Sequence, residues 1–184
     1  MSRGTYHHGD LRAAILGEAA RLVAEHGADA ISLRALAREA GVSHAAPAHH
    51  FTDRRGLFTA LAAQGYTLLA DALAAARPDF IDAAVAYVRF AIDHPGHYAV
   101  MFDRTLLDTT DLELAAAEAA AAAELTAGVA SLTDPKAQAD PVTARLAAWS
   151  LVHGFSTLWL NRAVADGDPM ILARKLGLML FERG

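Results

Sequence analysis

The segment from residue 32 to residue 55, SLRALAREAGVSHAAPAHHFTDRR, constrains the fold of this chain more than any other. Ser32 is a residue type that caps helix N-termini, and Gly41 stands where the chain must leave that helix with a positive φ. Between them, apolar residues recur at helical spacing, at Leu33, Leu36, Ala37 and Ala40. Ser43 can then cap a second helix that runs through Phe51. This layout is that of a helix-turn-helix, although a helical hairpin that serves only as scaffold has the same pattern.

The residues that follow the turn, GVSHAAPAHHFTDRRGLF, carry a more specific signal. Gly41-Val42-Ser43 opens the second helix, His50-Phe51 closes it, and Asp53-Arg54 starts the next one. At this spacing the elements resemble the signature of TetR-like repressors, and the likeness extends over residues 6 to 60. That family usually has a tyrosine that touches a phosphate two residues before the His-Phe pair, where this chain has Ala48. The resemblance implies an N-terminal three-helix DNA-binding domain, a long fourth helix, and a C-terminal helical domain for ligand binding and dimerisation.

Two segments of the second half, HPGHYAVMF (94–102) and WSLVHG (149–154), resemble a C-terminal domain class of these regulators that is named for its Trp, His and Gly. Trp149 and His153 are four residues apart, so they lie on one helix face. With neighbouring large side chains they predict an effector pocket lined by Tyr87, Phe90, Tyr98, Met101, Phe102, Trp149 and His153. The alternative is that these side chains simply fill a helical core.

Composition agrees with an all-α protein. The 184 residues are rich in Ala, Leu and Arg and nearly lack alternating β-branched runs. The absence of cysteine excludes a disulfide framework and a thiolate zinc site. No signal-peptide pattern and no apolar run of about 20 residues is present, so we expect a cytoplasmic protein. No nucleophile elbow, glycine-rich phosphate loop or paired-carboxylate motif indicates an enzyme, and we expect no cofactor.

Charge is distributed unevenly. The formal net charge is −5, but the first 55 residues hold seven arginines against six acids, or +1, and the remainder holds nine basic against fifteen acidic side chains, or −6. Local arginines at helix ends must therefore attract the DNA backbone. We expect the DNA contacts to come from Arg3, Tyr6, Ser32, Arg34, Ser43, His44, Ala45, His49, His50 and Arg54.

Periodicity and stop signals divide the chain into helices. They are expected at about 10–26, 32–40, 43–51, 53–76, 79–94, 96–104, 111–132, 141–164 and 169–182, with a polar loop at 133–141. The expected domains are 1–55 and 56–184. The last two helices are apolar around most of their circumference, which predicts a dimer interface through Leu151, Phe155, Leu158, Leu172, Leu176 and Met179.

These patterns predict a sequence-specific transcriptional regulator. We expect a homodimeric repressor that binds palindromic double-stranded operator DNA and is released by a small, largely apolar effector. Two alternatives stay open. One is a metal-responsive regulator whose ligands would be Asp93, His94 and His97, with His153 as a remote fourth. Pro95-Gly96 breaks the helical geometry that would aim His94 and His97 together, so we expect no metal site. The other is a helical protein-interaction module that does not bind DNA.

Overall fold

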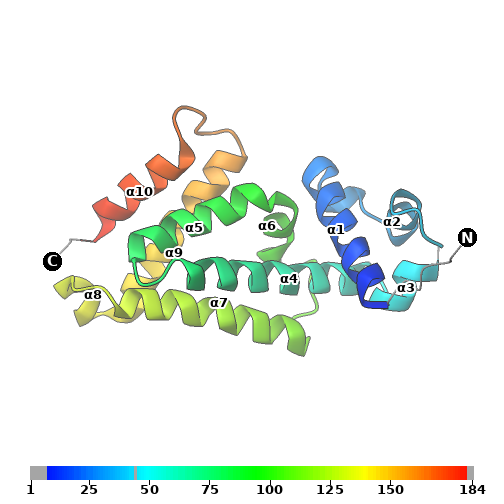
Figure 1. Ribbon diagram of the computed structural model, residues 1–184, viewed down its shortest axis with the longest axis horizontal. Coiled ribbons are helices and arrows are strands. Elements are labelled where there is room, and N and C mark those ends of the chain that lie inside the picture. Colours follow the sequence, from blue (N-terminus) through cyan, green and yellow to red (C-terminus); the bar gives the residue numbers. More distant parts are fainter. Residues whose placement is uncertain (1–7, 44, 182–184) are drawn as a thin grey trace, which may run out of the picture. The chain divides into compact units, whose positions relative to one another are not determined.

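The computed structural model describes residues 8–43 and 45–181, and every regular element in this part of the chain is a helix (Figure 1). The prediction of an all-α protein is confirmed. The elements are α1 (His8–His26), the 3₁₀ turn η1 (Ala28–Ala30), α2 (Leu33–Glu39), α3 (Ala45–Phe51), α4 (Arg54–Ala75), α5 (Phe80–Asp93), α6 (Pro95–Met101), α7 (Leu112–Ala130), α8 (Pro135–Ala139), α9 (Pro141–Leu160) and α10 (Pro169–Leu180).

The predicted loop at 133–141 is wrong, because it contains the short helix α8. Asp134 caps this helix by accepting hydrogen bonds from the backbone nitrogens of Lys136 and Ala137, and Pro135 occupies its first turn. Ala137 is buried. An Asp-Pro pair can begin either a turn or a helix. Here it begins a helix, one residue of which, Ala137, packs into the core.

The chain divides into two compact units. The N-terminal unit comprises residues up to 65 together with 94–115, and the C-terminal unit comprises residues 66–93 together with 116 onward. This division differs from the expected boundary at residue 55, because the start of α4 and all of α6 pack with the N-terminal helices. The assignment of separate roles to 1–55 and 56–184 stays a prediction.

The core of the N-terminal unit is built on one face of α1, where Ile15, Ala19, Leu22 and Val23 are buried. Helix α6 packs across this helix at Gly96. A Cβ atom added to Gly96 would lie 1.9 Å from the carbonyl oxygen of Ala20, so only glycine allows the two backbones to approach this closely.

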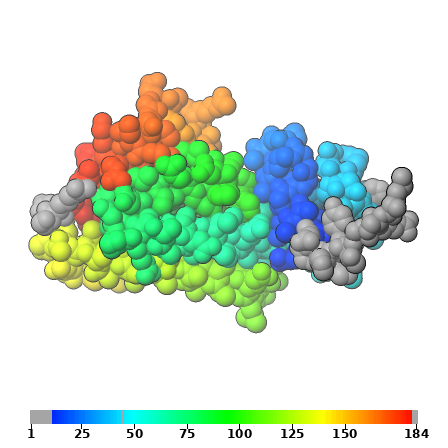
Figure 2. Space-filling view, viewed as in Figure 1, coloured from blue at the N-terminus to red at the C-terminus, as the bar shows by residue number. Residues whose placement is uncertain are grey.

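In the C-terminal unit, α10 packs on α5 and α9, as the surface in Figure 2 shows for α10 (red) over α5 (green). Their shared core contains Val88, Phe155 and Ala173. Gly177 of α10 allows this close contact, since a Cβ atom there would lie 3.2 Å from the Ile81 side chain. Of the described helices, α4 is long and apolar enough to cross a membrane by composition, but 50% of that window is buried within the protein, as in the core helix of a globular protein.

Candidate functional site

The first candidate site is the helix-turn-helix formed by α2 and α3. Ser32 caps α2 as predicted, because its hydroxyl accepts a hydrogen bond from the backbone nitrogen of Ala35 at 3.1 Å. Gly41 has the predicted positive φ, at 65°. The backbone nitrogen of Val42 donates to the carbonyl of Ala37 at 3.0 Å, which closes the turn. Local sequence therefore sets the geometry of this corner.

Helix α3 has one buried and one exposed face. Pro47 and Phe51, four residues apart, are both buried and anchor the helix to the unit. The opposite face carries Ala45, Ala48 and His49, all exposed. An anchored helix with an exposed face has the form required to enter a major groove. Pro47 therefore acts through packing, a role that its position in the sequence did not reveal.

The junction between α3 and α4 is unusually tight. Thr52 has a positive φ of 60°, and Asp53 caps α4 by accepting a hydrogen bond from the nitrogen of Gly56 at 2.7 Å. A Cβ atom on Gly56 would lie 2.1 Å from the carbonyl oxygen of Phe51. Gly56 therefore allows α4 to begin close to the end of α3, the helix predicted to read DNA and called the recognition helix below. Sequence reasoning missed this residue, although a glycine in the first turn of a helix is a visible signal.

Arg54 has a structural role that the sequence did not predict. Its guanidinium donates hydrogen bonds to the carbonyl oxygens of Ala28 and Ile31 at 2.8 and 3.0 Å. It also lies 4.8 Å above the ring centroid of Phe58. The side chain therefore ties the connection between α1 and α2 to α4. Its contact with a phosphate stays a prediction, and any such contact would have to share a guanidinium that the fold already uses.

The other predicted DNA contacts are placed as follows. Ser43 is exposed at the end of the turn, and Arg34 is exposed at the start of α2. His50 is half-buried at the end of α3. The ring centroids of His49 and His50 are 5.6 Å apart. Arg3, Tyr6 and His44 lie outside the described residues. The structure thus brings Ser43, Ala45, His49 and His50 onto one short segment.

The second candidate site is a polar cluster between α5 and α9 of the C-terminal unit. The hydroxyl of Tyr87 lies 3.0 Å from Nδ1 of His153, and Nε1 of Trp149 donates to the same hydroxyl at 3.4 Å. Burial lowers the pKa of His153, which favours the neutral ring. Nδ1 of the neutral imidazole can accept a hydrogen bond from the Tyr87 hydroxyl. The predicted pairing of Trp149 and His153 on one helix face is confirmed, with ring centroids 5.9 Å apart.

Helix α9 also carries a buried hydroxyl three residues after His153. Ser156 is fully buried, and its Oγ has no hydrogen-bond partner among the described residues. An unsatisfied buried hydroxyl is costly, and it is a feature that a bound ligand can satisfy. Of the remaining predicted pocket residues, Phe90 is buried in the C-terminal unit, whereas Tyr98, Met101 and Phe102 belong to the N-terminal unit.

The histidines proposed for the metal-responsive alternative are engaged differently. Nε2 of His97 lies 3.0 Å from Oε1 of Gln64, and the rings of His94 and His97 meet edge to face with centroids 5.7 Å apart. Within the part of the chain that the structure describes, no three His, Asp or Glu side chains are arranged to hold a metal ion.

The residues of the predicted dimer interface differ in exposure, and the interface itself stays a prediction. Phe155 is buried, and Leu172 and Leu176 pack against it in the core of the chain itself, because one face of α9 and of α10 packs within the unit. Leu151 is half-buried, while Leu158 and Met179 are 49% and 83% exposed. The other large apolar side chains that α9 and α10 expose are Val142, Leu146, Trp149, Ile171 and Leu178.

A three-helix head with an exposed recognition helix, joined to further helices, defines the class of helix-turn-helix regulatory proteins. Comparison with known families agrees. Residues 15–61 match the model of bacterial regulatory proteins of the tetR family, and residues 80–176 match that of a tetracyclin repressor-like C-terminal domain. The chain belongs to the TetR family. It is a DNA-binding transcriptional regulator and not an enzyme.

Solved structures show the same fold over nearly the whole chain. A protein of unknown function from Rhodococcus sp. RHA1 is 32% identical with a TM-score of 0.77, covering 97% of each chain. A tetR-family regulatory protein from Rhodococcus RHA1 is 21% identical with a TM-score of 0.74, covering 95% of this chain and 98% of that one. The TetR-family regulator PfmR from Thermus thermophilus is also 21% identical with a TM-score of 0.74, covering 92% and 97%. No curated protein matches the sequence.

Proposed function

We propose that this regulator is a cytoplasmic, homodimeric repressor that reads a palindromic operator through α3 and releases it when a small, largely apolar effector binds. The observation that carries the DNA-reading role is the division of α3 into an anchored face, with Pro47 and Phe51 buried, and an exposed face that carries His49. Such a helix can present side chains to base edges without moving its own support.

The test of base reading uses duplexes selected from a random pool by the protein itself. His49→Ala should change discrimination at one base-pair position, by about 1–3 kcal/mol if the ring bonds to a base edge. The matched control is His26→Ala, since His26 is exposed at the end of α1 rather than on α3. Equal losses of affinity for every duplex variant would count against base reading by His49.

Dimerisation is proposed because two half-sites about 34 Å apart need two recognition helices. The exposed apolar residues Leu146, Leu158, Ile171 and Met179 of α9 and α10 are the surface that supports it. Sedimentation of Leu146→Glu and Met179→Glu should show monomers at concentrations where the wild type is a dimer. Leu112→Glu is the control, because Leu112 is 84% exposed but lies on α7. A wild-type monomer at micromolar concentration would refute the proposal.

The effector role rests on the cluster of Tyr87, Trp149 and His153 and on the unsatisfied hydroxyl of Ser156. These groups offer a few polar contacts among apolar walls, as ligand sites do. A thermal-shift screen of apolar compounds would identify a ligand. His153→Ala should then preserve DNA affinity and blunt release by that ligand. If this variant melts earlier but responds normally, His153 is a core residue and not a ligand contact.

A further inference from the structure

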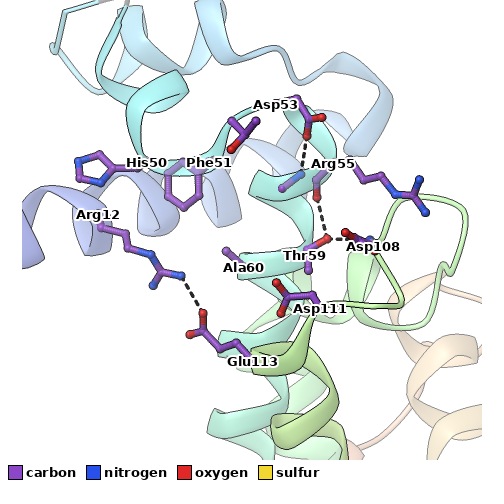
Figure 3. Close-up of a pocket in the computed structure, with 12 residues that line it drawn as sticks. Arg12, His50, Phe51, Asp53, Arg55, Thr59, Ala60, Asp108, Asp111 and Glu113 are labelled. Carbon is purple, nitrogen blue, oxygen red and sulfur yellow. Dashed lines mark hydrogen bonds and ion pairs between the residues drawn. The ribbon is translucent and has the colours of Figure 1, made fainter.

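A polar cleft of about 390 Å³ lies within the N-terminal unit, between α1, the junction of α3 and α4, and the start of α7 (Figure 3). Its charged lining consists of Arg12, Asp53, Arg55, Asp108, Asp111 and Glu113. Two cations against four carboxylates give this lining a formal charge of −2. His50 and Phe51, the last residues of the recognition helix, form part of the same wall. An acidic surface therefore adjoins the segment proposed to meet DNA.

Arg12 crosses this cleft from α1. Its Nη2 atom lies 3.3 Å from Oε2 of Glu113, and Figure 3 shows the guanidinium pointing toward that carboxylate. The guanidinium also lies 5.7 Å from the ring centroid of Phe51. The Arg12 and Glu113 side chains are 38% and 67% exposed. An ion pair this exposed is weak and is readily exchanged for another anion.

Glu113 is nevertheless held near Arg12, because the segment before it is fixed to α4. The carbonyl oxygen of Leu107 accepts two hydrogen bonds from Arg55, at 2.6 and 2.9 Å. The backbone nitrogen of Asp108 donates to Oγ1 of Thr59 at 2.8 Å. Asp111 then caps α7 by accepting a hydrogen bond from the nitrogen of Leu114. The carboxylate that meets Arg12 is therefore presented from an anchored helix start.

The other arginines near α1 and α4 are committed in different ways. Arg21 pairs with Glu18 and Glu25 along α1, whereas Arg54 and Arg55 donate to backbone carbonyls. Arg54 also lies 3.6 Å from the exposed carboxylate of Asp29, but two backbone carbonyls hold its guanidinium. The partner of Arg12 is an exposed carboxylate on another helix, 101 residues away in sequence. Arg12 also stands at the end of the recognition helix. A phosphate that approached His50 would compete directly with Glu113 for this guanidinium, and guanidinium–phosphate pairs are frequently bidentate.

We propose that Arg12 is a phosphate-contacting residue of the DNA interface and that Glu113 competes with DNA for it, so that the pair restrains DNA binding by the free protein. This inference rests on the proposed DNA-reading role of α3. Removing the charge of Glu113 frees Arg12 to contact a phosphate. Removing the charge of Arg12 eliminates both the contact and the competition.

The experiment measures binding of a selected duplex across a series of salt concentrations. Glu113→Gln should tighten binding by up to about fivefold near 0.1 M salt, because the exposed ion pair that it removes is weak. Arg12→Gln should flatten the plot of log affinity against log salt by about one unit, as for one lost phosphate contact. Arg12→Gln should weaken binding, and the double variant should match it. Asp71→Asn is the matched control, because it removes the same charge from an exposed residue of α4 that does not line the cleft.

Arg12→Lys provides a second variant that keeps the charge if Arg12→Gln fails to fold, and it should retain most of the response to Glu113→Gln. The inference is overturned if Glu113→Gln behaves like Asp71→Asn, or if it tightens binding equally when Arg12 has been replaced by Gln. If the wild-type protein binds no duplex at all, the proposed DNA-reading role fails first. A wild type that binds, together with a silent Glu113→Gln, refutes the competition alone.

Discussion

Acidification is expected to destabilise the N-terminal unit through His97 of α6. This side chain is 7% exposed, and its Nε2 lies 3.0 Å from Oε1 of Gln64. A carbonyl oxygen can only accept, so Nε2 donates this hydrogen bond. Burial, with a smaller contribution from neighbouring His94, lowers the pKa of His97 to about 4. The folded protein therefore holds the ring neutral at a pH where an exposed histidine is already charged.

The size of the effect follows from the difference between the two states. An unfolded histidine titrates near pH 6.5, so the unfolded chain takes up a proton that the folded chain refuses as the pH falls. The unfolding free energy therefore has its full value well above pH 6.5, and it falls as the pH drops from about 6.5 to about 4. Linkage gives a loss of about 2 kcal/mol in unfolding free energy between pH 7 and pH 5, and about 3 kcal/mol by pH 4.

Urea unfolding followed by circular dichroism at pH 7, 6 and 5 measures this loss. His97→Gln lacks the titrating ring, so its stability should fall less than that of the wild type over this range. His153 also has a lowered pKa, but it is present in both proteins and cancels in the comparison. His26→Gln serves as the control for an exposed histidine. Parallel pH profiles for the wild type and His97→Gln would show that the reasoning is wrong.

Three further substitutions test contacts that shape the head. Gly96→Ala should destabilise the protein by about 1–3 kcal/mol or prevent folding, because the new Cβ atom would meet the backbone of Ala20; a melting temperature equal to that of the wild type would contradict this. Ser32→Ala removes the side-chain bond to the nitrogen of Ala35 and should cost about 1 kcal/mol in urea unfolding; Ser32→Asp, which can still cap, should restore most of it. Arg54→Met should cost about 1.5–3 kcal/mol, because two backbone carbonyls lose a charged donor; a loss of DNA affinity with unchanged stability would instead assign Arg54 to phosphate alone.

Local signals were enough to predict most of the helices and the helix-turn-helix corner. Ser32, Gly41 and the apolar spacing between them act within a few residues, so the structure that they favour does not depend on distant parts of the chain. The same local reasoning missed α8, because Asp134-Pro135 is compatible with both a turn and a helix start. Burial of Ala137 is a tertiary contact that the sequence pattern did not reveal.

Only the tertiary structure decided which of the predicted contact residues are already engaged within the fold. Arg54 and Phe155 belong to residue types that suit a DNA contact and an apolar interface, yet the fold engages Arg54 with backbone carbonyls and buries Phe155 in the core. Gly96 is required by a backbone 76 residues earlier in the chain, at Ala20. The pairing of Arg12 with Glu113 likewise joins residues 101 positions apart. Helix periodicity specifies a face but not its partner, because the partner depends on how the helices pack.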